Sequence, residues 1–332
     1  MKKILMLLLL LLITGCSSIE STVKSELPFL AFDGEYYGYI NSEGKVLIPF
    51  QFLYARDFTD TGLAAVGKGT YTGSEWGYID ETGRVVIEYQ FDKVKNFTRN
   101  GLAAVMLDNR WGYIDETSKV VIDFLFDDAK SFTENGLSAV MLDNKWGYID
   151  ETGRVVIEYQ YDDTNSFTEN GLAAVELDYD WGYIDETGKK VINYQYDYTS
   201  FFSNNGLAQV NLDGKWGYID HTGKVVIGYQ FDYNHPFSEN GLAAVMLDFK
   251  WGYIDKTGKL VIGYQYDFAR SFSSNGLAVV EIDSKYGYID ETGKVVIGYQ
   301  FEAAAPFYNN KLAAARLDGK LVYIDETGKV VY

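Results

Sequence analysis

Residue types that commonly carry catalysis are scarce in this chain of 332 residues. It has two histidines, His221 and His235, and neither has a Ser, Cys or Asp nearby in an arrangement that suggests a catalytic triad. No glycine-rich loop is followed by a helical segment, as a phosphate site of that kind requires. A single cysteine excludes an intrachain disulfide framework and a cysteine-based zinc site. We therefore expect a protein that is not an enzyme and uses no cofactor.

Carboxylates recur at three positions, represented by Asp80, Asp92 and Asp108. Carboxylates stacked at one spacing could bind Ca²⁺, which takes about six to eight oxygen ligands. The segment 80–83 lacks that number of ligands, and we expect Asp80 to accept hydrogen bonds from the amides of a turn instead. We therefore expect no metal site.

The charge of the chain limits its partners. It carries 29 basic and 47 acidic residues, a net charge of −18. Nucleic acids require a basic surface, so we expect no nucleic-acid partner. Acidity favours a protein or another basic surface as partner, and we expect the chain itself to be a monomer.

The N-terminus has the layout of an export signal. Residues 1–3 are Met-Lys-Lys, and residues 4–13 are all apolar, too short a run to span a membrane, which takes about 20 residues. Residues 13–16, Ile-Thr-Gly-Cys, resemble the lipobox of bacterial lipoproteins. The resemblance implies cleavage before Cys16 and a lipid on its sulfur; the alternative is an ordinary secretory signal with an unrelated cysteine.

This interpretation divides the chain into three parts. Residues 1–15 are the predicted signal peptide, and residues 16–28 are the lipidated cysteine and a serine-containing flexible tether. Residues 29–332 are a repeat array. The predicted location is the cell envelope, on an outer membrane or the cell surface, with the lipid on Cys16 as the contact with the membrane.

All six tryptophans of the chain belong to one repeated pentapeptide, Trp-Gly-Tyr-Ile-Asp, whose copies start 35 residues apart. These copies begin at Trp76, Trp111, Trp146, Trp181, Trp216 and Trp251. Related copies begin at Tyr37, Tyr286 and Leu321, which makes nine in all. Strand-forming residues dominate each copy, and no helical periodicity is present. Each unit of about 35 residues is therefore predicted to be a three-stranded antiparallel meander, with an Asp-Glu-Thr-Gly turn such as residues 80–83, followed by a long connection.

The array resembles the bacterial WG-repeat (KWG-repeat) family from Leu30 to Tyr332. The resemblance rests on the Trp-Gly-Tyr-Ile-Asp copies, the Thr-Gly-Lys turn, the Tyr-Asp segment and the Gly-Leu-Ala step. It implies no general biochemical role.

Two all-β architectures fit nine such units: an open, superhelically twisted stack or a closed β-propeller. A length of 35 residues is short for a four-stranded propeller blade, and nine blades exceed the usual range of about four to eight. No unit is split between the two ends of the chain, although ring closure often uses such a split. We therefore expect the open stack.

The tryptophans could form a row of platforms on which sugar rings stack, or they could pack between adjacent sheets. Regular use in six copies suits packing, which we expect. A repeat array offers a long surface for multivalent contacts, so the predicted function is a non-catalytic binding or protein-interaction scaffold. The alternatives are a glycan- or peptidoglycan-binding protein that uses the repeated aromatic residues, and a passive structural spacer.

Overall fold

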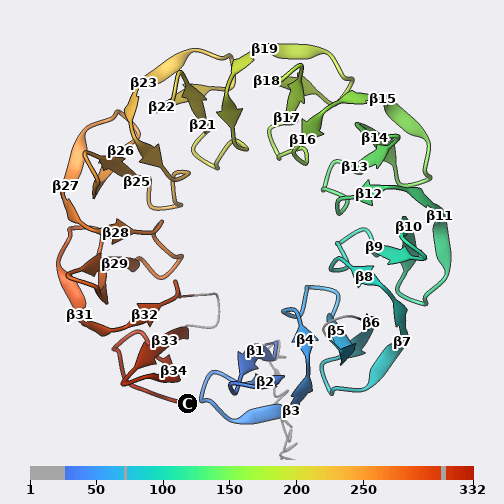
Figure 1. The fold of residues 1–332 in the computed structure, drawn as a ribbon, viewed down its shortest axis with the longest axis horizontal. Helices are drawn as coiled ribbons and strands as arrows, with labels where there is room; N and C mark the ends of the chain where they lie inside the picture. Colours follow the sequence, from blue (N-terminus) through green and yellow to red (C-terminus); the bar gives the residue numbers. More distant parts are fainter. Residues whose placement is uncertain (1–26, 71–72, 308–311) are drawn as a thin grey trace, which may run out of the picture.

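The computed structural model describes residues 27–70, 73–307 and 312–332, which form strands and turns without a helix. The strands make nine small antiparallel sheets that follow one another around a ring (Figure 1). The fold is a nine-bladed β-propeller, and the blades are numbered 1–9 in chain order. The expectation of an open stack is therefore wrong.

The first five blades contain the following strands. Blade 1 has β1 (Phe29–Phe32), β2 (Tyr37–Ile40) and β3 (Val46–Phe52). Blade 2 has β4 (Tyr54–Ala55), β5 (Leu63–Thr70), β6 (Gly73–Asp80) and β7 (Val85–Phe91). Blade 3 has β8 (Lys93–Val94), β9 (Leu102–Leu107), β10 (Arg110–Asp115) and β11 (Val120–Phe126). Blade 4 has β12 (Asp128–Ala129), β13 (Leu137–Leu142), β14 (Lys145–Asp150) and β15 (Val155–Tyr161). Blade 5 has β16 (Asp163–Thr164), β17 (Leu172–Leu177), β18 (Asp180–Asp185) and β19 (Lys190–Tyr196).

The last four blades repeat this order. Blade 6 has β20 (Tyr198–Thr199), β21 (Leu207–Leu212), β22 (Lys215–Asp220) and β23 (Val225–Phe231). Blade 7 has β24 (Tyr233–Asn234), β25 (Leu242–Leu247), β26 (Lys250–Asp255) and β27 (Leu260–Tyr266). Blade 8 has β28 (Phe268–Ala269), β29 (Ala278–Ile282), β30 (Lys285–Ile289) and β31 (Val295–Phe301). Blade 9 has β32 (Ala303–Ala304), β33 (Ala313–Leu317) and β34 (Lys320–Ile324).

Blades 2–8 have four strands each, where the sequence predicted three. The extra strand, β8 in blade 3, is two residues long and pairs with β9 through Lys93 and Val94. Such strands lie toward the centre of the ring, whereas long strands such as β19 and β27 form its rim (Figure 1). Because the inner strand is so short, four strands fit into 35 residues.

Two kinds of turn connect the three long strands of a blade. Between β9 and β10, Asp108 and Asn109 both have positive φ, 50° and 62°, as a two-residue type I′ hairpin requires. In the turn between β6 and β7, the Asp80 carboxylate accepts hydrogen bonds from the amides of Thr82 and Arg84 at 3.0 and 3.1 Å. Gly83 has a φ of 84°, so the turn follows the prediction.

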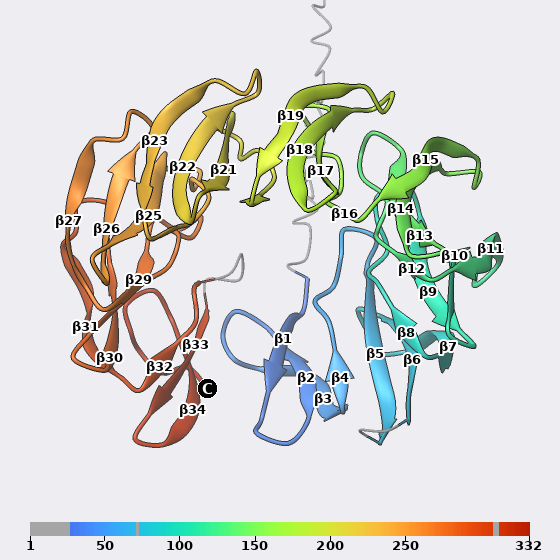
Figure 2. The same cartoon turned by 45° about the horizontal axis from the view of Figure 1, so that its top comes forward.

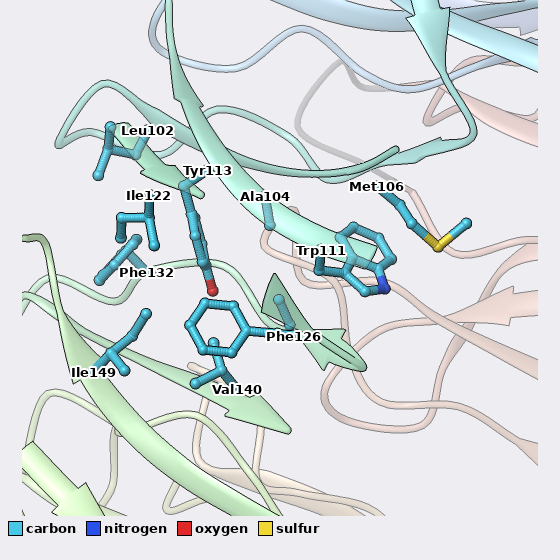
Figure 3. Packing of buried hydrophobic residues seen from close by; sticks show 11 residues of the cluster. Leu102, Ala104, Met106, Trp111, Tyr113, Ile122, Phe126, Phe132, Val140 and Ile149 are labelled. Atoms are coloured by element: carbon cyan, nitrogen blue, oxygen red, sulfur yellow. The ribbon is translucent and has the colours of Figure 1, made fainter. Parts of the chain in front are cut away.

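The hydrophobic core lies between neighbouring blades, as Figure 3 shows for blades 3 and 4. One face of blade 3, with Trp111 and Tyr113, packs against Phe132 and Val140 of blade 4. The Tyr113 and Phe132 rings are 4.8 Å apart, and the Tyr113 hydroxyl donates a hydrogen bond to the Lys130 carbonyl at 2.9 Å. The same inter-blade bond recurs in the following blades, for example from Tyr183 to the Ser200 carbonyl at 2.7 Å.

Blades 1 and 9 close the ring through side-chain contacts, without sharing strands. Ala31 and Ile40 of blade 1 form one apolar cluster with Leu312 of blade 9. The Phe50 and Tyr332 rings stack at 5.6 Å across the same boundary. The two blades lie side by side in both views (Figures 1 and 2). Closure therefore needs no unit split between the ends of the chain. The absence of a split unit was a criterion for the open stack, and it favoured the wrong architecture.

The predicted signal peptide and Cys16 lie outside the described residues. The part of the chain that is described holds no helix long and apolar enough to cross a membrane.

Candidate interaction surface

The six tryptophans, the predicted binding residues, occupy one position in the inter-blade core. Trp111, Trp146, Trp181 and Trp251 are only 5–7% exposed, and Trp76 and Trp216 are half-buried. Trp111 lies in the cluster with Phe126 of its own blade and Val140 of the next (Figure 3). This burial favours the packing role. Ligand binding by the tryptophans stays a prediction.

The three recurring carboxylates lie at turns and blade edges. A hydrogen bond from the Thr82 hydroxyl, with those from the turn amides, lowers the pKa of Asp80 to about 2. The Asp92 carboxylate accepts a hydrogen bond from the Asn109 amide at 3.4 Å, and Asp108 is the first residue of that hairpin tip. Within the described residues, no group of three or more His, Cys, Asp or Glu side chains is placed to hold a metal ion.

The two histidines lie apart. His221 is exposed in the turn after β22, whereas the His235 ring stacks on Trp251 at 5.1 Å. Burial lowers the pKa of His235, and the positive charge of Arg270 lowers it further.

The centre of the ring is a hollow of about 1560 Å³, lined by loops of blades 2–6. Arg99 bridges two neighbouring loops, with ion pairs to Asp60 at 3.1 Å and Glu134 at 2.7 Å. The exposed ring of Phe201 also lines this hollow. All these ion-paired side chains are mostly exposed, so each pair contributes little to stability.

One face of the ring carries the two-residue hairpins that precede the tryptophan strands; we call it the hairpin face. Copies of one hairpin position differ sharply in residue type. The second tip residue is Asn109, Asn144, Tyr179, Gly214, Phe249, Ser284 or Gly319. Tyr179 and Phe249 are 88% and 86% exposed, and both have positive φ, 71° and 63°. This conformation costs most residues about 1–2 kcal/mol and is adopted more easily by Asn and Gly.

The inner strands of blades 6 and 7 add further exposed rings. Tyr198 lies between Trp181 and Trp216, with ring centroids 5.8 and 5.6 Å away. Tyr233 lies between Trp216 and Trp251 in the same way, at 5.6 and 5.8 Å. Tyr198 and Tyr233 are 49% and 44% exposed. In blades 3–5 the same position holds Lys93, Asp128 and Asp163.

We call Tyr179, Tyr198, Trp216, Tyr233 and Phe249 the aromatic arc. It spans blades 5–7, and apart from the tryptophan the corresponding positions of blades 3 and 4 hold no aromatic residue. Apart from Trp216, these residues were not predicted to bind, because the repeat is defined by the residues that its copies share. The sequence signal that identifies them is a residue type that differs from the one in the other copies.

Acidic residues flank the blade 5 end of the aromatic arc. In blades 3, 4, 6 and 7 a cation at the start of the tryptophan strand pairs with a later aspartate, as Lys215 does with Asp232 at 2.6 Å. Blade 5 has Asp180 at the lysine position, so Asp197 has no such partner. Partial burial, with repulsion from Asp163 and Asp162, raises the pKa of nearby Glu176.

Comparisons with known proteins agree with the repeat and the fold. The pattern of the family described as "WG containing repeat" matches residues 37–69, 76–111, 111–146, 146–179, 181–216, 216–250, 251–286 and 286–320. No curated protein matches the sequence.

Among solved structures, a eukaryotic initiation factor is similar with a TM-score of 0.67 and 11% identity, over 92% of this chain and 94% of that one. The Dos1 propeller is more distant, with a TM-score of 0.45 and 12% identity over 81% of this chain and 90% of that one. At 11% identity, the likeness to the initiation factor shows the fold alone. The eight matched segments cover most of the sequence, and the chain therefore belongs to the WG-containing repeat family.

Proposed function

We propose that this propeller is a non-catalytic protein-interaction scaffold, held at the cell envelope by a lipid on Cys16. The observation that carries the scaffold role is the aromatic arc. Its tips Tyr179 and Phe249 are almost fully exposed, in a backbone conformation that disfavours them, and equivalent blades fold without them. Residues that contribute nothing to folding and expose apolar surface are typical of an interface.

The anchoring part of the proposal rests on the sequence around Cys16. It is tested by producing the full chain in bacterial cells with a labelled fatty acid and separating membrane from soluble fractions. We expect label and membrane association for the natural chain, and neither for Cys16→Ser. A labelled Cys16→Ser chain in the membrane fraction would contradict the lipid anchor.

The scaffold part is tested by photo-crosslinking in the producing cells. A photoreactive amino acid replaces Tyr233 on the hairpin face, Phe201 in the central hollow or His221 in a turn on the other side of a blade. We expect discrete adducts, sensitive to protease, from at least one position. The scaffold role fails if all three positions give no adduct, or if the adducts are degraded by glycan hydrolases and not by protease.

A further inference from the structure

We infer that the aromatic arc and the acidic residues beside it bind an extended polypeptide segment that contains lysine or arginine. The inference rests on the proposed scaffold function and adds the surface and the chemistry of the partner. It follows from three departures of blades 5–7 from blades 3 and 4, which share their backbone and their inter-blade packing.

The first departure is the exposed apolar surface. At the hairpin tips, blades 3 and 4 have Asn109 and Asn144, which suit positive φ and are polar. Blades 5 and 7 have Tyr179 and Phe249 there, and the tip between them ends in Gly214, which has no side chain. Tyr198 and Tyr233 expose further ring surface between these blades. The tips Tyr179 and Phe249 are not in any of the inter-blade clusters.

The second departure is the loss of an internal cation. In blades 2–4 a cation of the same blade lies over each tryptophan ring. The distances from the cation to the ring centroid are 5.8 Å for Arg56 and Trp76, 5.5 Å for Lys95 and Trp111, and 5.2 Å for Lys130 and Trp146.

Blades 5 and 6 have Asn165 and Ser200 at this position. Trp216, whose blade has the small Ser200 at this position, is half-buried and contacts the exposed rings of Tyr198 and Tyr233. A lysine or arginine of a partner can supply the cation–π contact that the chain makes by itself in blades 2–4.

The third departure is charge. Asp180 replaces the lysine or arginine found at this position in blades 3, 4, 6 and 7, and it is exposed together with Asp163 and Asp197. Lys145 and Lys215 are paired with Asp162 and Asp232, so they do not neutralise this group. Exposed carboxylates beside aromatic rings complement a basic side chain, whose aliphatic part covers a ring while its head meets a carboxylate. This complementarity favours a basic polypeptide over a neutral glycan.

The probe is a fluorescein-labelled decapeptide of alternating lysine and proline, which stays extended in water. Its fluorescence anisotropy is measured with the full chain in nonionic detergent, at low and at physiological salt. We expect saturable binding that weakens as salt rises, and no binding of a decapeptide of alternating glutamate and proline.

The variants replace residues of the aromatic arc and its acidic neighbour Asp180 by those found in equivalent blades. Asp180→Lys restores the cation of blades 4 and 6, and we expect it to weaken binding about tenfold or more. Tyr179→Asn with Phe249→Asn should weaken it about fivefold. The matched control is Leu125→Gln, which replaces an exposed apolar residue on the outer strand of blade 3 by the glutamine of the other blades. It should leave affinity unchanged, and circular dichroism should show all variants folded.

The inference is overturned if the basic peptide does not bind at millimolar concentration in low salt, or if Asp180→Lys and the tip variants bind it as the natural chain does. It is also overturned if a chitin hexasaccharide binds and the same variants abolish that binding, because the aromatic arc is then a glycan site. If protease-sensitive crosslinks persist in the arc variants, the proposed scaffold function stands and only the assignment of this binding surface is refuted.

Discussion

The Tyr323 hydroxyl accepts a hydrogen bond of 2.8 Å from the backbone amide of Phe32, 291 residues earlier in the chain. Tyr323 is the ninth copy of the tyrosine that follows the tryptophan position. In blades 1–8 this hydroxyl donates to a carbonyl in the connection of the next blade, for example from Tyr39 to Arg56 at 2.7 Å. Blade 9 has no later blade, so its tyrosine uses an amide of blade 1 and becomes part of the ring closure.

Replacing Tyr323 by Phe tests this closing contact. The variant keeps the ring of Tyr323 in its apolar cluster but leaves the Phe32 amide without its partner, which should lower the free energy of unfolding by about 1–2 kcal/mol. Urea unfolding followed by tryptophan fluorescence measures the change. Tyr299→Phe is the control, because Tyr299 packs at the edge of the cluster between blades 7 and 8 and is not part of the cluster that closes the ring. Equal stability of Tyr323→Phe and the natural chain would contradict the role of this bond.

Relief of strain at the hairpin tips should stabilise the protein. Phe249 has a φ of 63° and is 86% exposed, so Phe249→Asn removes an unfavourable conformation and no packing. We expect unfolding to become less favourable by up to about 1 kcal/mol, seen as a higher midpoint in thermal unfolding. Asn144→Ala at the equivalent tip of blade 4 should have the opposite effect, since Asn144 also has positive φ, 61°. A lower midpoint for Phe249→Asn would show that its ring supports the fold.

Sequence alone predicted the local chemistry of a blade well. Asp80 and Gly83 form the turn expected of them, because both roles depend on residues within five positions of one another. The nine copies and their all-β character are also confirmed. They too depend on residues close together in the sequence.

Ring closure could not be predicted in this way. It depends on the small rotation between neighbouring sheets, summed over nine blades, and on the contact of Tyr323 with Phe32, which no other copy repeats. The inner strands were missed because two residues, such as Lys93 and Val94, are too few to show a period of two. The aromatic arc was missed because residues such as Tyr198 and Tyr233 differ from the copies that define the repeat.

The aspartates of the turns should make stability depend on acid. The pKa of Asp150 is lowered to about 2, chiefly by the hydrogen bond from the Thr152 hydroxyl, whereas an unfolded aspartate titrates near about 3.9. This contribution is complete above about pH 4 and is lost as the pH falls toward about 2, because the unfolded chain then binds more protons. Urea unfolding between pH 5 and pH 2 measures the slope.

A triple variant isolates these turns. Asn41 accepts turn hydrogen bonds in blade 1 without a charge, from the amides of Glu43 and Lys45 at 3.0 and 2.8 Å. Replacing Asp150, Asp185 and Asp220 by Asn should therefore preserve the fold at pH 7 and reduce the loss of stability in acid. An unchanged acid slope would assign the pH dependence to other carboxylates.

His235 should contribute a second, separate pH dependence. Its ring stacks on Trp251 and lies 5.7 Å from the Tyr233 ring, and burial followed by the charge of Arg270 lowers its pKa. An unfolded histidine titrates near about 6.5, so stability is complete above that pH and falls as the pH drops below it, because the unfolded chain takes up the proton first.

The test compares the free energy of unfolding at pH 7.5 and pH 5.5 in the natural chain and in His235→Asn. Asn165 holds the equivalent position in blade 5, so the substituted residue suits the backbone. We expect the natural chain to lose stability over this interval and His235→Asn to lose less. His221→Asn is the control, since His221 is exposed in its turn and its substitution should leave the natural difference intact. If His221→Asn removed the difference and His235→Asn did not, the histidine stacked on Trp251 would not be the group that titrates.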